Sequence, residues 1–233
     1  ECVILGFGLE KEMWAIEYKQ LMGDTTQTAV WQQLDEYLNR KWAFKDGREI
    51  GISCTCIDSG GHSTSEVYKY CKPREHRRIF AVKGRGGGEG IPLVGKYSRS
   101  NKMNVALFPV GDDESKTLIL SRLMVDQEGE GYIHFPRNKE KGFDTEYFKG
   151  LVSEKKVKKY VKGHLKFEWI KEAGVRNEPI DTMKYGLAAL EILNPNFEVI
   201  KRFFDENKDF YKHDQANKGT SGGRKKIISK GIN

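Results

Sequence analysis

The sequence predicts an α/β fold in which a mixed β-sheet is flanked by helices. Short apolar runs alternate with amphipathic helical patterns along most of the chain, as expected for strands and helices that share a core. The 233 residues include 38% hydrophobic side chains and four tryptophans, which is enough for one large domain. One lysine-rich segment alternates charged and apolar residues in the manner of an exposed β-hairpin. We therefore expect a folded domain over residues 1–195 that carries a hairpin on its surface.

The N-terminal part predicts a hairpin, a helix and a strand. Cys2–Phe7 and Met13–Tyr18 have the apolar character of two strands joined by a turn. Thr28–Leu38 places apolar residues at helical spacing, with its first residue as a possible N-cap. Glu49–Ile57 is rich in small and β-branched residues and predicts one strand that stops at Asp58.

The middle of the chain continues the alternation of helices and strands. We expect a helix over Ser63–Tyr70, strands over Arg78–Val82 and Val105–Val110, and a helix over Glu114–Met124. The Gly-rich and basic stretch Lys83–Lys102 lacks periodicity and predicts a long mobile loop.

The remaining pattern predicts five more elements and an extension. We expect a short strand over Tyr132–Phe135, a helix over Thr145–Leu151, the hairpin strands Lys155–Val161 and Leu165–Ile170, and a helix over Pro179–Leu193. Residues 196–233 form a basic C-terminal extension, expected to be disordered after residue 217 because too few apolar groups remain there.

Charge and cysteine content exclude several classes of protein. The net charge is +7, and the segment from Lys218 to the end carries five basic residues and no acid, so residues 1–217 are nearly balanced. Four cysteines without Cys-x-x-Cys spacing disfavour a disulfide scaffold and a structural zinc site. No apolar run approaches the ~18 residues of a membrane span, and no signal peptide opens the chain, so we expect a soluble, intracellular protein.

Two acids stand at the ends of apolar elements. Asp58 follows a predicted strand and precedes Gly60-Gly61, and Asp181 lies in the first turn of a predicted helix. Each has a structural alternative, since Asp58 can cap the next helix and Asp181 can interact with the helix dipole. If both converge at the carboxyl edge of a sheet, a divalent cation would relieve their repulsion and polarise a phosphate. Oxygen donors favour Mg²⁺ or Mn²⁺ over zinc.

Basic residues gather around the Gly-rich stretch. Residues 72–102 carry nine lysines and arginines against two glutamates, a candidate track for a phosphate backbone. The lysine-rich hairpin is a second candidate, with a solvated face as an equally favoured alternative. Gly90–Tyr97 resembles a Walker A motif, but Tyr97 replaces the required Ser or Thr and neither a preceding strand nor a following helix is predicted, so an ATPase is not supported.

Short motifs follow one another in order along residues 1–193: Gly6-Phe7-Gly8, Glu12-x-Trp14-x-Ile16, Asp58-Ser59-Gly60-Gly61, Val82-Lys83-Gly84, Pro109-Val110-Gly111, Arg122-Leu123, His134-Phe135-Pro136 and Arg176-Asn177-Glu178-x-x-Asp181. As an ordered set they resemble the carboxyl-terminal nuclease domain of the terminase large subunits of lambda-type tailed phages and prophages.

The resemblance implies a ribonuclease H-like domain that cuts concatemeric viral DNA during packaging, using aspartates that hold two divalent cations, Mg²⁺ or Mn²⁺. Asp58 and Asp181 match the catalytic, metal-binding acids of the family. The family's remaining aspartate lies on a first strand upstream of Cys2, which is absent here, so the chain as given is expected to be a fragment with an incomplete metal site, which weighs against its activity. The resemblance also implies double-stranded DNA, the terminase small subunit and the portal protein as partners, in the host cytoplasm and away from any membrane.

Further residues are candidates for the active site and for binding DNA. Second-tier candidates for the site are Glu178, Asn177, Glu17 and His62, and the candidates for holding the DNA backbone are Lys83, Arg85, Lys96 and Arg99. The competing hypothesis is a noncatalytic DNA-binding or assembly module of the packaging motor that keeps the same fold and basic surface.

Overall fold

A computed structural model describes the chain except for residues 45–47, 87–89, 101–102, 162 and 207–233. The chain divides into two compact units, of which unit 1 is Glu1–Asn39 with Ile52–Pro195 and unit 2 is Arg40–Gly51 with Asn196–Asn233. The stretch expected to be disordered, after residue 217, lies outside the described residues. Among the helices that the structure describes, none combines the length and apolar character needed to cross a bilayer.

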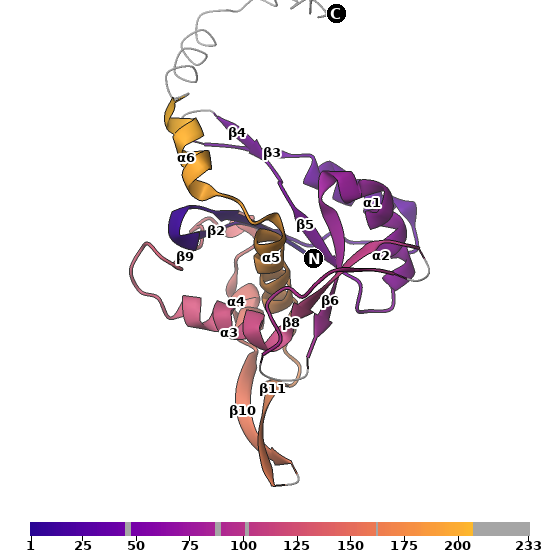
Figure 1. The fold of residues 1–233 in the computed structure, drawn as a ribbon, viewed down its shortest axis with the longest axis vertical. Coiled ribbons are helices and arrows are strands. Elements are labelled where there is room, and N and C mark those ends of the chain that lie inside the picture. The colour runs from indigo at the N-terminus through magenta and orange to yellow at the C-terminus, as the bar shows by residue number, and fades with distance from the viewer. Residues whose placement is uncertain (45–47, 87–89, 101–102, 162, 207–233) are drawn as a thin grey trace, which may run out of the picture. The chain divides into compact units, whose positions relative to one another are not determined.

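The first sheet of unit 1 is built on the predicted N-terminal hairpin. Strands β1 (Cys2–Phe7) and β2 (Met13–Lys19) pair antiparallel, and β9 (Ile133–His134) joins β2 in parallel. Alternate residues of β2, Met13 and Ala15, are buried, as period-two strand geometry requires. They pack in one core with helices α3 (Asp112–Leu123), α4 (Thr145–Leu151) and α5 (Glu178–Leu193), which are labelled in Figure 1.

The second sheet of unit 1 has the order β5-β6-β8-β7. Strands β5 (Thr55–Asp58), β6 (Ile79–Arg85) and β8 (Ala106–Gly111) run parallel, and β7 (Ser98–Arg99) pairs antiparallel with β8. Helices α1 (Thr28–Leu38) and α2 (Thr64–Cys71) contribute Leu38 and Tyr70 to a core shared with this sheet. Because the three main strands are parallel, their carboxyl ends meet at one edge of the sheet.

Helix α5 packs against both sheets. Ile180, Met183 and Leu187 belong to the core of the first sheet, whereas Tyr185 and Ala188 pack with buried residues of β6 and β8. The mixed α/β class is therefore confirmed. The strands that pack with α5 form two separate sheets, however, where a single mixed sheet was expected, since the hydrophobic pattern of a strand does not specify its partner.

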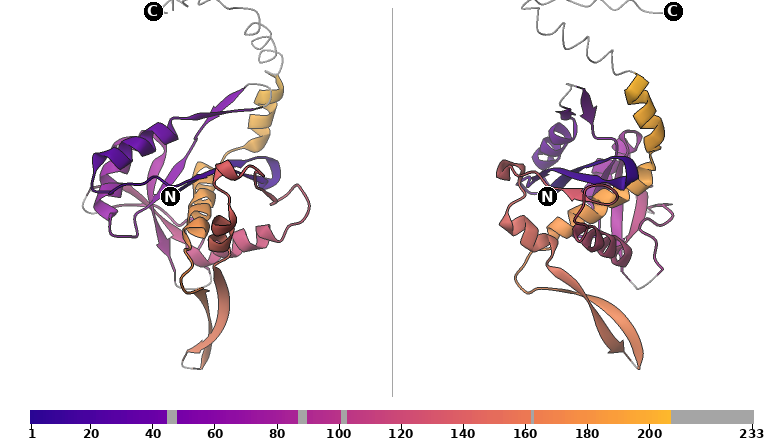
Figure 2. Two further views of the ribbon diagram at one scale, coloured as in Figure 1. Left: turned by 180° about the vertical axis from the view of Figure 1, so that it is seen from behind. Right: turned by 90° about the vertical axis from the view of Figure 1, so that its left-hand side faces the viewer.

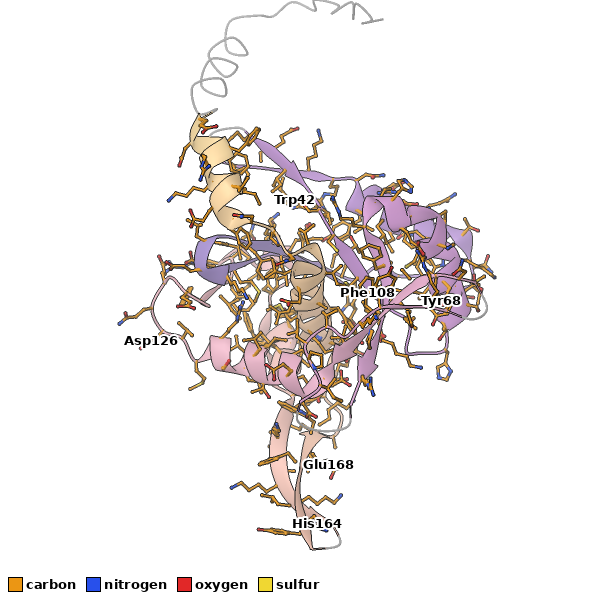
Figure 3. All side chains as sticks on the ribbon, viewed as in Figure 1. Trp42, Tyr68, Phe108, Asp126, His164 and Glu168 are labelled. Atoms are coloured by element: carbon orange, nitrogen blue, oxygen red, sulfur yellow. The ribbon has the colours of Figure 1, made fainter. Side chains whose placement is uncertain are left out.

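The predicted hairpin is confirmed as β10 (Glu154–Val161) and β11 (His164–Lys171), which pair antiparallel along their whole length. It extends from unit 1 beyond α3 and α4 in every view (Figures 1 and 2). His164 lies at its far end and Glu168 partway along it (Figure 3).

Several element boundaries differ from expectation. The predicted strand over residues 49–57 is two strands, β4 (Glu49–Gly51) in unit 2 and β5 in unit 1, and Gly51, a weak strand former, ends the first of them. Helix α1 has Gln27 at its N-cap and Thr28 inside its first turn. Part of the predicted loop is ordered, because β6 continues to Arg85 and β7 pairs with β8.

Unit 2 contains a strand, β3 (Lys41–Ala43), and a helix, α6 (Phe197–Glu206), that the sequence pattern did not predict. Strand β3 pairs antiparallel with β4, and α6 follows in the C-terminal extension. Within this unit the rings of Phe44 and Phe204 lie 6.3 Å apart, and the Arg48 guanidinium lies over both. Among the described residues, the short 3₁₀ helices are η1 (Leu9–Lys11), η2 (Lys72–Arg77) and η3 (Lys139–Lys141), which belong to unit 1.

Candidate active site

Asp58 ends β5 with its side chain open to solvent. Its Oδ1 accepts a hydrogen bond of 2.9 Å from the backbone N–H of Gly60. Ser59 is buried and binds the Val82 carbonyl of the neighbouring strand through both its backbone N–H and its hydroxyl, each at 2.8 Å. Helix α2 begins only at Thr64, so the alternative in which Asp58 caps that helix is wrong. The carboxylate is fixed by its own turn and remains exposed.

Asp181 lies in the first turn of α5, as predicted, and both of its carboxylate oxygens accept hydrogen bonds. The Lys184 ammonium donates to Oδ1 at 2.8 Å and the Asn177 amide donates to Oδ2 at 3.2 Å. Lys184 also donates to Oδ1 of Asp112 at 2.7 Å. The Lys184 side chain is only 4% exposed, whereas the two carboxylates are 26% and 31% exposed. A buried ammonium therefore joins two carboxylates that border solvent.

Asp112 is a site residue that sequence analysis missed. It follows β8 directly and begins α3, which starts two residues earlier than predicted. A Cβ at Gly84 would lie 2.9 Å from Asp112 Oδ1, so the absence of a side chain on β6 gives this carboxylate its room. The signal was present in the sequence, because Asp112 follows an apolar strand in the same way that Asp58 does.

Tyr185 connects Asp58 to this group. Burial raises the pKa of Tyr185 well above its usual range, and the Lys184 ammonium opposes this rise. The negative charges of Asp58 and Asp181 raise the pKa further, as does a hydrogen bond between Tyr185 and Asp58. The Lys184 ammonium lies 4.5 Å from the centroid of the Tyr185 ring. Two adjacent residues of α5 therefore interact with Asp58, Asp112 and Asp181, at the carboxyl edge of β5, β6 and β8.

The charge of Lys184 is stabilised by its partners. Burial alone would lower the pKa of the Lys184 ammonium, but the electrostatic effects of Tyr185 and Asp181 and the hydrogen bonds to Asp112 and Asp181 outweigh it and raise the pKa. A buried lysine keeps its proton where carboxylates surround it. The site therefore contains three carboxylates and one internal ammonium.

Of the four second-tier candidates, Asn177 contacts an acid of the candidate site. Asn177 belongs to the site, because its amide donates both to Asp181 and, at 2.7 Å, to the buried carboxylate of Glu154. Glu178 pairs with Arg176 at 3.2 Å. Glu17 lies on β2 of the first sheet, where it accepts a hydrogen bond of 3.1 Å from Tyr37. His62 is exposed in the loop between β5 and α2.

The basic candidates also separate into two groups. Lys83 and Arg85 lie on β6 on either side of Gly84 and are exposed, but strand alternation turns their side chains to the face opposite the one on which Gly84 meets Asp112. Lys96 is exposed in the connection between β6 and β7. Arg99 instead donates two hydrogen bonds to Glu75, at 2.8 Å and 2.6 Å, and this carboxylate offsets its charge.

The carboxylate oxygens of the candidate site are the kind of ligand that a hard divalent cation prefers, but there are too few of them for a complete metal site. Within the ranges that the structure describes, no three Asp, Glu, His or Cys side chains converge as a metal-binding group. Mg²⁺, however, is commonly bound through one or two carboxylates, with water and substrate phosphates in the other positions. The carboxylate of Asp58 is exposed and that of Asp181 is partly exposed, so solvent and a cation can reach both.

Comparisons with known proteins relate the chain to phage DNA packaging. The family described as "Terminase large subunit gpA, endonuclease domain" matches residues 1–202. The terminase large subunit of Escherichia phage lambda is 33% identical over 198 residues, and that of Enterobacteria phage P21 is 30% identical over 197 residues. Each alignment covers 82% of this chain and 30% of the relative, so the chain spans less than a third of their length. No solved structure matches the chain.

Proposed function

The chain belongs to the family of terminase large subunit gpA endonuclease domains, and from this premise we propose that it is a divalent-metal-dependent endodeoxyribonuclease. Its substrate would be concatemeric phage DNA, cut during packaging by hydrolysis of phosphodiester bonds. The observation that carries the proposal is that Asp112 and Asp181 share the Lys184 ammonium while Asp58 interacts with the adjacent Tyr185. Acids at the carboxyl ends of parallel strands are a common location for an α/β active site.

The proposed fold type is ribonuclease H-like. It is supported by an antiparallel hairpin that precedes three parallel strands, and by a helix, α5, that packs on both sheets and supplies an acid in its first turn. Two divalent cations, Mg²⁺ or Mn²⁺, would supply an activated water and stabilise the negative charge that develops on the cleaved phosphate.

The chain's own residues have distinct roles in this proposal. Asp58 and Asp181 would hold the cations, and Asp112, through Lys184, holds Asp181 in a fixed orientation. Lys83 and Arg85 lie next to Gly84 with exposed cationic ends, so they would bind phosphates that flank the cut, while Lys96 would bind the backbone farther along. Arg99 would bind a DNA phosphate only if its hydrogen bonds to Glu75 were broken.

The test is nicking of supercoiled plasmid with Mn²⁺, Mg²⁺ or EDTA. We expect Mn²⁺-dependent nicking that is lost in Asp58→Ala and in Asp181→Ala. The assay includes a longer version that carries the residues upstream of Glu1, because the resemblance places a further aspartate of the family there. The proposal fails if neither version nicks DNA with any divalent ion, or if both substitutions leave nicking intact.

One observation favours a second function, a noncatalytic DNA-binding or assembly module of the packaging motor. The described part of the chain lacks a group of three converging metal ligands, and Lys184 already neutralises part of the acidic charge. DNA binding without nicking by the longer version would support this function, in which the terminase small subunit and the portal protein are the partners to be tested for binding.

A further inference from the structure

The two faces of the β10–β11 hairpin differ in chemistry. Opposite residues of an antiparallel pair share a face, so the register defines an arm face with three pairs: Lys156 with Trp169, Lys158 with Phe167, and Tyr160 with Leu165. Each of these pairs sets a lysine or tyrosine against a large apolar side chain. The other face carries Lys155 and Lys159, together with Glu168, which pairs with Lys159 at 2.7 Å.

The apolar groups of the arm face are unusually open. Tyr160 is 75% exposed, Leu165 47% and Phe167 39%. The Lys156 ammonium lies 5.1 Å from the centroid of the Phe167 ring, so charge and aromatic surface lie side by side. Alternation of lysines with exposed aromatic rings is typical of surfaces that bind nucleic acid, where the lysines contact phosphates and the rings contact bases or sugars.

The net positive charge of the hairpin favours a nucleic acid as its binding partner over a protein. Residues 154–171 contain seven lysines and two glutamates. Of these glutamates, Glu154 is buried at the base, where the Lys116 ammonium lies 2.6 Å from its carboxylate. The positive charge of the arm face is therefore not offset by an exposed acid on the same face of the described strands.

The hairpin is anchored firmly and beside the candidate active site. The Trp169 indole donates to Asp113 at 2.5 Å, and the Lys116 ammonium lies 5.7 Å from the Trp169 ring. Glu154 accepts from the same Asn177 amide that donates to Asp181. These contacts fix the base of the hairpin to α3 and to the start of α5, while its far end projects outward (Figures 1 and 3).

From this arrangement we propose that the arm face of the β10–β11 hairpin binds duplex DNA and directs it past Asp58 and Asp181. A two-stranded ribbon fits the major groove, which is about 12 Å wide, and places its lysines near the phosphates on either side. The inference rests on the proposed function for the identity of the nucleic acid. It assigns to the hairpin a task separate from cutting, namely holding the DNA.

The test compares two double variants that lose the same charge from the same strand. Lys156→Gln/Lys158→Gln alters the arm face, and Lys155→Gln/Lys159→Gln is the matched control on the opposite face. Binding of a short labelled duplex is followed by fluorescence anisotropy in EDTA, over ~50 to ~200 mM salt. The arm-face variant should lower the slope of log K against log salt by about 2 and weaken binding about tenfold or more at ~0.1 M salt.

A third variant tests the aromatic component. Tyr160→Ser/Phe167→Ser should weaken duplex binding about tenfold without changing the salt slope, because apolar contacts in the groove release no counterions. The proposal is overturned if the two lysine variants weaken binding equally, if neither does, or if only single-stranded DNA depends on the arm face. Plasmid nicking tests the nuclease proposal separately from the hairpin proposal. If the protein never nicks DNA but the arm-face variant still loses duplex binding, the nuclease proposal fails and the hairpin proposal stands.

Discussion

Lys184 is the residue on which the arrangement of the candidate site depends most. Its ammonium is buried between Asp112 and Asp181, at 2.7 Å and 2.8 Å, and lies over the ring of Tyr185. Removing one member of a buried charged group leaves the others without compensation, which costs more than the group contributes to stability. Lys184 thus allows acids from α3 and α5 to lie together at the edge of the sheet.

We expect Lys184→Met, which keeps most of the side-chain volume, to lower the free energy of unfolding by about 2–4 kcal/mol. The lower part of this range applies because Asp112 and Asp181 are partly exposed and water can solvate them. The measurement is urea unfolding at neutral pH, followed by circular dichroism.

Lys149→Met is the matched control for this substitution. Lys149 pairs with Glu146 across the same helical spacing of three residues, but both side chains are more than half exposed. Its loss should leave the free energy of unfolding nearly unchanged, because solvent screens an exposed ion pair. Equal effects of the two substitutions would show that the buried position of Lys184 has no special importance.

At the scale of elements, the contact between α4 and α5 sets the position of the first turn of α5. A Cβ at Gly150 of α4 would lie 2.8 Å from the Arg176 carbonyl oxygen and 2.6 Å from the Pro179 ring. Glycine at this point therefore permits the close approach that places Asn177 and Asp181 at the site.

Gly150→Ala should lower the free energy of unfolding by about 1–3 kcal/mol through overpacking, although alanine is the better helix former by about 1 kcal/mol. Thermal unfolding measures the change. Gly51→Ala serves as the control, because a Cβ there would meet nothing within 4 Å. A stabilised Gly150→Ala protein would contradict the close packing of α4 on α5.

Another contact between elements links α1 to α2 and η2 through one carboxylate. Asp35 accepts hydrogen bonds from Tyr70 at 3.0 Å, from Arg77 at 3.1 Å and twice from Arg74. The Arg74 guanidinium lowers the pKa of Asp35, burial opposes the change, and Tyr70 reinforces it.

The low pKa makes the contribution of Asp35 dependent on pH. Because the folded-state pKa lies below the unfolded value of about 3.9, the stabilisation is fully present above that value and is lost as the pH falls through the folded pKa. Asp35→Asn should cost about 1–3 kcal/mol at neutral pH. Urea unfolding at a series of pH values should show this difference shrinking below about pH 4. A difference that stays constant down to strongly acidic pH would contradict the role of Asp35.

On the scale of the whole molecule, the sequence predicts elements better than their assembly. Most strands and helices of unit 1 lie where hydrophobic periodicity places them, because burial of one face produces that periodicity. The assignment of strands to two sheets was missed, as was the division of residues 49–57 between two units. Pairing of distant strands depends on tertiary contacts that local patterns do not encode.

The candidate site was predictable in part for the same reason. Asp58 and Asp181 each follow or begin an apolar element, and Tyr185 interacts with both. Lys184 was not recognised, since a lysine inside an amphipathic helix ordinarily faces solvent, and its burial follows only from the carboxylate that Asp112 contributes from another helix. Charge partners that meet across elements are visible only once the fold is known.

The central claim is that DNA is cut at the carboxyl edge of β5, β6 and β8. The most direct measurement is the initial rate of Mn²⁺-dependent plasmid nicking by Asp58→Asn, with Asp126→Asn as the control at an exposed acid in the loop after α3 (Figure 3). The substitution keeps the shape of the side chain and removes its charge. We predict a loss of at least ~100-fold for Asp58→Asn, as for removal of a group that stabilises the transition state, and an unchanged rate for Asp126→Asn. Equal rates for the two variants would contradict the claim.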